Sequence, residues 1–299
     1  MCGGILMRKI ACFCSLLAIA GPALALDITV VDDHALFPEG PIMVDGNLYF
    51  VEYGAGKVTE FDGNSLSEFW MQEGSGPSAI AKFGDGFLVT GYDNNSMILV
   101  DKNGQTVKNV TADSSGTPMM GPNDIALDGK GGAYFSLSGG WESAPIVGKI
   151  GHMSPDGSVT IVADDLHYPN GLVLSADAST LFVNETYANR IIRFAVNPDG
   201  TLGQRSLFVR MGDIGQAYDG EPDGIKLGPD GNLYVGLYSI GRIVVLDPET
   251  GALIKEIDVP SAAAPNLTFS ADGKTMYVTA VDQKDAAPWK GTVYAVSGY

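Results

Sequence analysis

The segment Pro222–Leu237, which reads PDGIKLGPDGNLYVGL, contains the pattern that decides the fold. A short apolar run follows the Pro-Asp pair, and Asp230-Gly231 then supplies the positive φ that a tight turn needs. Leu233, Tyr234 and Val235 favour a second strand after that turn. The segment therefore predicts an antiparallel β-hairpin that opens with proline and an acidic residue.

Five further units open in a similar way, with proline followed by one polar or acidic residue. The six pairs are Pro38-Glu39, Pro77-Ser78, Pro122-Asn123, Pro169-Asn170, Pro222-Asp223 and Pro265-Asn266. Successive pairs lie 39 to 53 residues apart, close to the length of a four-stranded propeller blade. The chain shows no helical periodicity of any length. The repeat predicts an all-β fold, a six-bladed β-propeller with four-stranded antiparallel blades.

The sixth unit contains only three strands and ends at Val296. We expect the N-terminal run Ile28–Val31 to supply the missing strand by pairing with the last blade. This closes the ring and leaves no sheet edge exposed. Residues 26–299 are therefore expected to form a single propeller domain.

Residues 1–25 are typical of a secretory signal peptide, with Arg8 and Lys9 ahead of an apolar run and a cleavage site at Ala23-Leu24-Ala25. The apolar run is shorter than the roughly 20 residues that cross a bilayer, and no later segment is long enough. We therefore expect a periplasmic or secreted protein with no membrane span after cleavage near Ala25.

Composition narrows the class of protein further. The 18 Lys and Arg against 35 Asp and Glu give a formal charge of −17, which becomes −19 when the leader is removed. This acidic excess argues against nucleic-acid binding, because phosphate attracts cationic surfaces. The three cysteines, Cys2, Cys12 and Cys14, all leave with the leader. Disulfides and thiol nucleophiles are thereby excluded.

The first strand of each propeller blade lines the central channel, so the residues that follow the six prolines should converge on its axis. They are Glu39, Ser78, Asn123, Asn170, Asp223 and Asn266. Carboxylate and amide oxygens without cysteine or histidine indicate a hard cation, for which calcium is the best fit. Asn and Asp also cap turns in general, but six equivalent positions around one axis favour a metal site.

The second strand of each blade returns to the same face, so its last residues should surround the mouth of the channel. These positions are Glu52-Tyr53, Tyr92-Asp93, Ser136, Asn184-Glu185, Tyr238-Ser239 and Val281-Asp282. Among them we expect Tyr53, Glu185 and Tyr238 to contact substrate. His167, just before Tyr168-Pro169, is a further candidate there, with a hydrogen-bonded loop histidine as the alternative.

These motifs resemble the gluconolactonase and senescence-marker-protein (regucalcin) family of six-bladed propellers. The resemblance covers nearly the whole chain after the leader, through Phe37–Pro41, Gly121–Asp124, Pro169–Leu172, Glu185-Thr186 with Arg190-Ile191, Pro222–Gly224 and Tyr277–Thr279. It implies that Glu39, Asn170 and Asp223 hold one divalent cation, calcium or else zinc, manganese or magnesium, and that Asn123 contacts substrate or metal. Several sugar lactonases carry an Arg where this chain has Gly121, which argues against a sugar lactone.

The resemblance also implies hydrolysis of a lactone or related cyclic ester. The carbonyl is then polarised by the cation, Asp223 acts as the general base that activates water, and Asn123 orients the substrate. Two alternatives stay open. One is a non-enzymatic periplasmic propeller with a structural metal, and the other is lyase or strictosidine-synthase-like chemistry at the same site.

Overall fold

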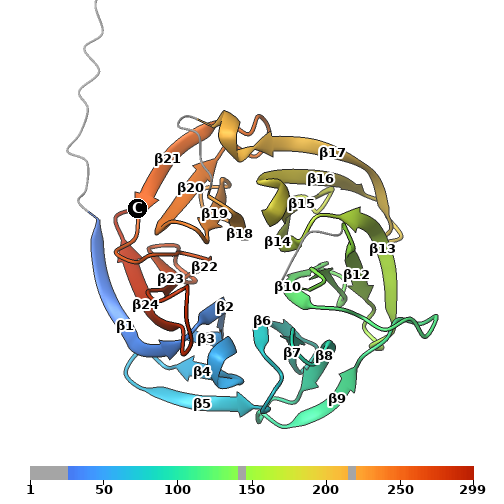
Figure 1. The fold of residues 1–299 in the computed structure, drawn as a ribbon, viewed down its shortest axis with the longest axis horizontal. Helices are drawn as coiled ribbons and strands as arrows, with labels where there is room; N and C mark the ends of the chain where they lie inside the picture. The colour runs from blue at the N-terminus through green and yellow to red at the C-terminus, as the bar shows by residue number, and fades with distance from the viewer. Residues whose placement is uncertain (1–25, 141–145, 215–219) are drawn as a thin grey trace, which may run out of the picture.

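The computed structural model describes residues 26–140, 146–214 and 220–299, whose strands form six four-stranded antiparallel sheets arranged in a ring (Figure 1). The predicted signal peptide, 1–25, lies outside the described residues. Within a blade, strands that follow one another in the chain are hydrogen-bonded neighbours. The predicted six-bladed β-propeller is confirmed.

Each blade contributes one strand to each of four concentric layers. The inner strands are β2 (Pro38–Val44), β6 (Pro77–Phe83), β10 (Pro122–Leu127), β14 (Pro169–Leu174), β18 (Pro222–Leu227) and β22 (Asn266–Phe269). The second strands are β3 (Asn47–Glu52), β7 (Gly86–Gly91), β11 (Ala133–Leu137), β15 (Thr180–Glu185), β19 (Leu233–Leu237) and β23 (Thr275–Val281).

The third strands are β4 (Lys57–Phe61), β8 (Ser96–Val100), β12 (Gly148–Met153), β16 (Arg190–Val196), β20 (Arg242–Leu246) and β24 (Lys290–Ser297). The outer strands are β5 (Leu66–Met71), β9 (Thr106–Val110), β13 (Val159–Leu166), β17 (Leu202–Arg210), β21 (Leu253–Asp258) and β1 (Asp27–Leu36). Short 3-10 helices follow three strands: η1 (Tyr53–Ala55), η2 (Thr186–Ala188) and η3 (Met211–Asp213). None of the helices in the described ranges has the length and apolar character needed to cross a bilayer.

The first strand of the chain completes the last blade. In Figure 1, β1 lies along the outer side of β24, and the register places Ile28 opposite Val296 and Val30 opposite Tyr294. The predicted closure of the ring is therefore confirmed. Because the two ends of the domain share one sheet, the ring cannot open without breaking this pairing.

The predicted Asp-Gly turns are seen most clearly between β2 and β3. Val44 lies opposite Asn47, so Asp45 and Gly46 form a two-residue turn. Both have positive φ, 51° and 89°, which is the type I′ geometry that matches the twist of a hairpin.

The apolar core lies between neighbouring blades. Leu88 of β7 and Phe135 of β11 are both fully buried in one cluster, and Val245 and Val278 occupy the equivalent space between the fifth and sixth blades. Each such side chain stabilises the fold by about 1.5 to 3 kcal/mol. All three cysteines lie within residues 1–25, so burial rather than disulfide bonding holds the blades together.

Candidate active site at the mouth of the channel

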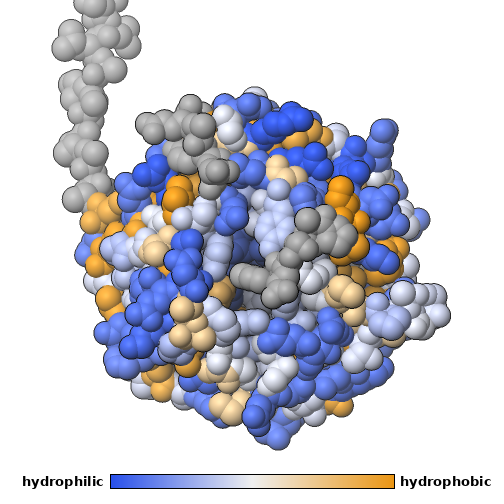
Figure 2. Space-filling view, viewed as in Figure 1, coloured by the Kyte–Doolittle hydropathy of each residue, from blue (hydrophilic) through white to orange (hydrophobic). Residues whose placement is uncertain are grey.

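The inner strands begin at one end of the channel, where a cavity of about 40 Å³ lies among five of the six blades. A hollow at the middle of the ring is visible in the space-filling view (Figure 2). The cavity, here called the mouth cavity, is lined by Phe37, Glu39, Tyr53, Ser78, Tyr92, Asn123, Tyr168, Asn170 and Asp223. Its volume holds an ion or about three water-sized groups.

Bulges at the start of the inner strands place the residues after proline in this cavity. The pairing of β14 with β15 shifts register between Pro169 and Leu172, and the pairing of β18 with β19 shifts between Pro222 and Ile225. The first and third blades carry the corresponding shift. A bulge adds a residue to one strand and redirects its side chains, so the hairpin can pair normally beyond the site.

Two carboxylates are buried in the mouth cavity. Glu39 and Asp223 are each only 7% exposed, and among the described residues neither forms an ion pair. Glu39 Oε2 accepts hydrogen bonds from the Gly40 N–H at 2.6 Å and from Asn266 Nδ2 at 2.9 Å. Burial raises the pKa of Glu39 to about 8. Burial, and then the negative charges of Glu39 and Asp124, raise the pKa of Asp223 well above its usual range.

Amide groups complete the polar part of the mouth cavity. The Asn170 amide lines the cavity together with Asp223 and acts to lower the pKa of that carboxyl, against the effect of burial. Asn123 Nδ2 donates to Ser138 Oγ at 3.1 Å, which orients the amide. Ser78 Oγ is engaged with backbone oxygens of Pro122 and Asn123, both at 3.1 Å.

This donor set fits a divalent cation. The polar groups that line the mouth cavity are carboxylate, amide and hydroxyl oxygens, which suit calcium or magnesium better than softer metals. Two buried carboxylates cost free energy unless positive charge compensates them. Glu39, Asn170 and Asp223 are thus able to hold such an ion between them.

Aromatic rings form the other wall of the cavity. The centroids of Phe37 and Tyr53 lie 5.5 Å apart, and those of Tyr53 and Tyr92 lie 6.5 Å apart. The Tyr53 hydroxyl donates to Asp93 Oδ1 at 2.9 Å, and the Tyr92 hydroxyl donates to the Gly139 carbonyl at 2.9 Å. Since these hydroxyls bind the protein, the tyrosines offer mainly ring surface to a ligand.

Two of the aromatic rings that line the mouth cavity, those of Phe37 and Tyr168, were not predicted from the sequence as site residues. Phe37 and Tyr168 each precede the proline of a blade and adopt positive φ, 52° and 56°. Gly76 and Gly121 have the same conformation at the equivalent positions. Large side chains rarely adopt it, and such strain concentrates at functional sites. An aromatic residue directly before the repeated Pro-Asn or Pro-Glu pair was the available signal.

The structure brings together seven of the residues predicted to surround the channel, and all of them line the mouth cavity: Glu39, Tyr53, Ser78, Tyr92, Asn123, Asn170 and Asp223. Tyr238 stands behind this wall, stacked on Phe37 with a centroid distance of 6.0 Å. The His167 ring packs against Tyr187 at 5.8 Å and is outside the cavity lining. Asn266, expected in the ring of ligands, is instead a hydrogen-bond donor to Glu39.

Glu185, expected to contact substrate, has a structural position. Its side chain is fully buried, bonded to Arg190 Nε at 2.6 Å and to the His167 N–H at 2.8 Å. Glu52 makes the equivalent contacts in the first blade, with Lys57 Nζ at 3.0 Å and the Leu36 N–H at 3.1 Å. Each glutamate therefore holds the segment that leads into the residue before proline in its own blade, which is Phe37 or Tyr168. The buried Glu185 side chain is not exposed to a substrate.

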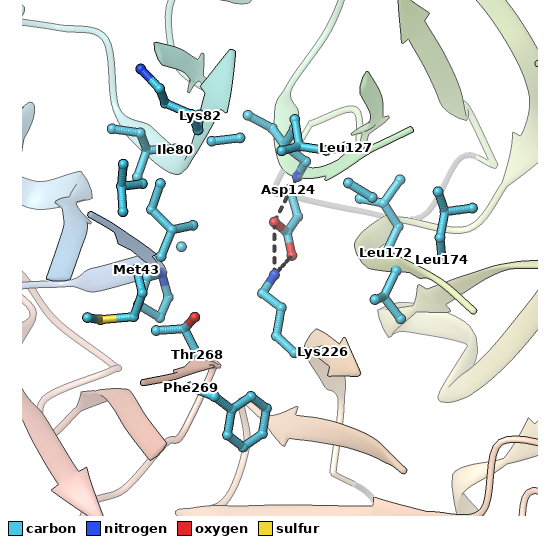
Figure 3. A pocket seen from close by; sticks show the side chains of 18 residues that line it. Met43, Ile80, Lys82, Asp124, Leu127, Leu172, Leu174, Lys226, Thr268 and Phe269 are labelled. Carbon is cyan, nitrogen blue, oxygen red and sulfur yellow. Dashed lines mark hydrogen bonds and ion pairs between the residues drawn. The ribbon is translucent and has the colours of Figure 1, made fainter. Parts of the chain in front are cut away.

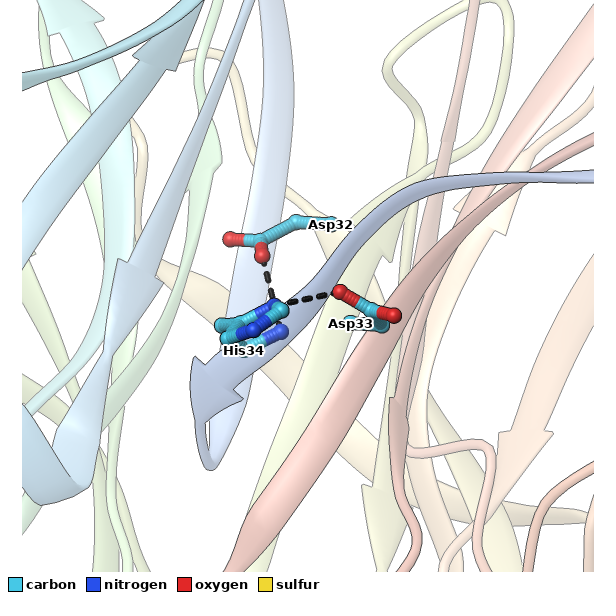
Figure 4. Close-up of side chains that lie close together, drawn as sticks. All are labelled: Asp32, Asp33 and His34. Atoms are coloured by element: carbon cyan, nitrogen blue, oxygen red, sulfur yellow. Dashed lines mark hydrogen bonds and ion pairs between the residues drawn. The ribbon is translucent and has the colours of Figure 1, made fainter.

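A second group of possible metal ligands, Asp32, Asp33 and His34, lies in β1 at the outside of the last blade (Figure 4). The Asp33 and His34 side chains are 65% and 88% exposed and pair with each other. The group is remote from the mouth cavity, and exposed acidic side chains of this kind are common on protein surfaces.

A family described as the SMP-30/Gluconolactonase/LRE-like region matches residues 37–282. A protein named lactonase drp35 from Staphylococcus haemolyticus is 28% identical over 243 residues, which cover 77% of this chain and 72% of that protein. The drp35 lactonase of Staphylococcus aureus strain MW2 is 28% identical over 227 residues, covering 72% and 67%.

Solved structures show the same fold. A gluconolactonase from Xanthomonas campestris superposes with a TM-score of 0.76 at 21% identity, covering 92% of this chain and 90% of that one. A calcium-binding protein, regucalcin, from Agrobacterium tumefaciens gives 0.75 at 21% identity, covering 90% and 94%. Virginiamycin B lyase from Staphylococcus aureus is less similar, with a TM-score of 0.61 at 15% identity, covering 91% and 99%.

Proposed function

Because the chain belongs to the SMP-30/gluconolactonase/LRE-like family, we propose that it hydrolyses a lactone at the opening of the mouth cavity, with the help of one divalent cation held within it. The observation that carries the proposal is the convergence of Glu39, Asn170 and Asp223 on one cavity beside Asn123. The relatives named lactonase support the reaction class. Calcium suits the oxygen donors best, and a structural neighbour described as calcium-binding agrees with that choice.

When bound, a divalent cation supplies Lewis acidity towards the lactone carbonyl. Asp223 accepts the proton of the attacking water, as a carboxylate within hydrogen-bond reach is able to do. Asn123, held by Ser138, orients the lactone. The water oxygen bonds to the carbonyl carbon, the ring C–O bond breaks, and the product is a hydroxy acid that releases one proton.

The aromatic wall favours a lactone with an apolar ring or substituent over a sugar lactone. Phe37, Tyr53 and Tyr92 offer ring surface, and no lysine, arginine or histidine is among the described residues that line the cavity. An arginine at position 121 would require the neighbouring chain to shift, because a Cβ there would lie 2.4 Å from the Gly139 oxygen and 3.1 Å from the Tyr92 ring. A polyhydroxylated substrate would therefore meet no cationic hydrogen-bond donor among the described residues that line the mouth cavity.

The test is a screen of alkyl-, aryl- and aldono-lactones with calcium-loaded protein, read by a pH indicator and by mass spectrometry of the product. We expect turnover of the apolar lactones, with one proton released and one water gained per molecule. Loss of turnover in an Asp223→Asn variant that still binds calcium supports the assigned base, and the exposed control Asp199→Asn should be unchanged. Elimination products without added water identify a lyase, and calcium binding without any turnover identifies a structural metal.

We also propose that residues 1–25 direct the protein out of the cytoplasm and are then removed. The positive start, apolar run and small residues at Ala23 and Ala25 support this. N-terminal sequencing of the protein recovered from periplasm or medium tests it. A first residue at Leu26 is expected, and intact Met1 or Met7 in the cytoplasm contradicts it.

A further inference from the structure

A second cavity occupies the part of the channel beyond the mouth cavity. It measures about 430 Å³ and is lined by later residues of the inner strands, such as Val44, Leu127 and Leu174. Most of its lining is apolar, but Asp124 and Lys226 meet within it (Figure 3). Lys82, the other lysine of the lining, donates to the Asp85 carbonyl at 2.9 Å.

The Asp124–Lys226 ion pair joins two blades that are not neighbours. Lys226 Nζ of β18 lies 3.1 Å from Asp124 Oδ2 of β10, with the blade of β14 between them in the ring. The Asp124 side chain is 4% exposed and that of Lys226 is 20% exposed. Asp124 Oδ1 also accepts the Ile125 N–H at 2.7 Å, so both oxygens of this side chain have a donor.

The Asp124–Lys226 pair influences the charge state of the carboxylates in the mouth cavity. Asp124 follows Asn123 in the chain, and its charge is among the causes that raise the pKa of both Glu39 and Asp223. Lys226 acts on Glu39 in the opposite direction. Among the described residues, Lys226 is the one basic side chain that forms an ion pair with any of these three carboxylates.

One divalent cation would balance the charges around the axis once Glu39 and Asp223 are ionised. The three buried carboxylates then carry three negative charges, and Lys226 compensates one of them. Buried charge is stable in proteins when opposite charge compensates it. The remaining two negative charges equal the charge of one divalent ion.

We propose that Lys226 is the internal counter-ion of the channel, a positioning residue that neutralises Asp124 so that the mouth cavity accepts one divalent cation. The inference rests on the proposed function, because it assumes that Glu39 and Asp223 hold that cation. Lys226 itself touches neither the substrate nor the reacting atoms.

The test is calorimetric titration of calcium chloride into chelator-treated protein, with the lysine and its partner changed singly and together. Lys226→Met leaves Asp124 uncompensated, so calcium should bind at least about tenfold more tightly. Asp124→Asn leaves Lys226 uncompensated, so calcium should bind at least about tenfold more weakly. The double variant Asp124→Asn with Lys226→Met should return to the wild-type affinity, and Lys226→Arg should keep it.

Opposite shifts that cancel in the double variant support the inference, because a merely structural pair would weaken binding in both single variants. Equal shifts, or a double variant as weak as Asp124→Asn, overturn it. If Lys226→Met does not fold, the Asp124→Asn and double variants still decide the sign. Opposite shifts without any lactone turnover contradict the proposed function alone, whereas turnover without calcium binding overturns the inference and leaves hydrolysis standing.

Discussion

Asn266 Nδ2 donates a hydrogen bond of 2.9 Å to Glu39 Oε2, and this bond spans the junction between the last and first blades. The two residues are 227 positions apart in the chain, and both are buried. Closure of the ring therefore also positions a predicted metal ligand. The sixth blade contributes to the site through this bond rather than through a ligand of its own.

Asn266→Ala should weaken calcium binding and lower the free energy of unfolding by about 1.5 to 3 kcal/mol, the range for a hydrogen bond to a charged group. Denaturant unfolding and calcium titration measure the two effects. Asn109→Ala on exposed β9 is the control and should change neither. Unchanged calcium affinity in Asn266→Ala contradicts a positioning role for this amide.

Glu39→Gln should reduce kcat/KM for the best lactone by about 10² to 10⁴, since it removes a charge from the centre while preserving shape. Calcium affinity should fall with it. Glu60→Gln, remote from the mouth cavity in β4, provides a matched control for activity. Full activity of Glu39→Gln in chelator would show that catalysis is independent of this carboxylate and of the cation.

The metal-free protein should become less stable as pH rises from about 4.5 towards about 8, the interval over which burial keeps Glu39 protonated in the folded state. The sign follows from linkage: the folded state binds more protons than the unfolded state there, so raising the pH favours unfolding. Thermal unfolding with chelator should show a steeper decline in the wild type than in Glu39→Gln, and calcium should reduce the difference. Parallel pH profiles of the two proteins would argue against this titration.

Glu185→Ala should destabilise the protein by about 3 kcal/mol, because Arg190 and the His167 N–H lose a buried acceptor. The KM of the folded enzyme should stay unchanged, since the side chain is fully buried outside the cavity lining. Glu52→Ala, its counterpart in the first blade, should behave alike in denaturant unfolding. A raised KM with normal stability would restore Glu185 as a substrate contact.

Tyr53→Ala should raise the KM for an aryl lactone by about tenfold, because ring surface is lost from the wall of the mouth cavity. Tyr53→Phe keeps the ring and loses only a hydroxyl that is bonded to Asp93, so its KM should stay within about twofold of the wild type. Steady-state kinetics of the two variants separate the roles of ring and hydroxyl. Equal losses in both would indicate that the hydroxyl contacts the substrate.

Much of the site was predictable from sequence because the repeat supplies geometry. Residues after the blade prolines occupy equivalent places, so Glu39, Asn123, Asn170 and Asp223 had to approach one axis. The ends of the second strands were less predictable. Tyr53 lines the mouth cavity, whereas Glu52 just before it and Glu185, its counterpart in the fourth blade, are tied to Lys57 and Arg190. The position at the end of a strand alone does not decide whether a side chain faces the cavity or pairs with a neighbouring cation.

The sequence by itself determined the number of blades, the closure by residues 28–31 and the oxygen-bearing side chains that surround the channel, because each follows from local pattern and repeat length. Only the tertiary structure decided the aromatic wall and the pairing of Asp124 with Lys226. Those two residues are 102 positions apart and meet in the channel from two blades that are not neighbours in the ring. A contact of this kind depends on the diameter of the closed ring and on the reach of the lysine side chain, and neither is encoded in a local stretch of sequence.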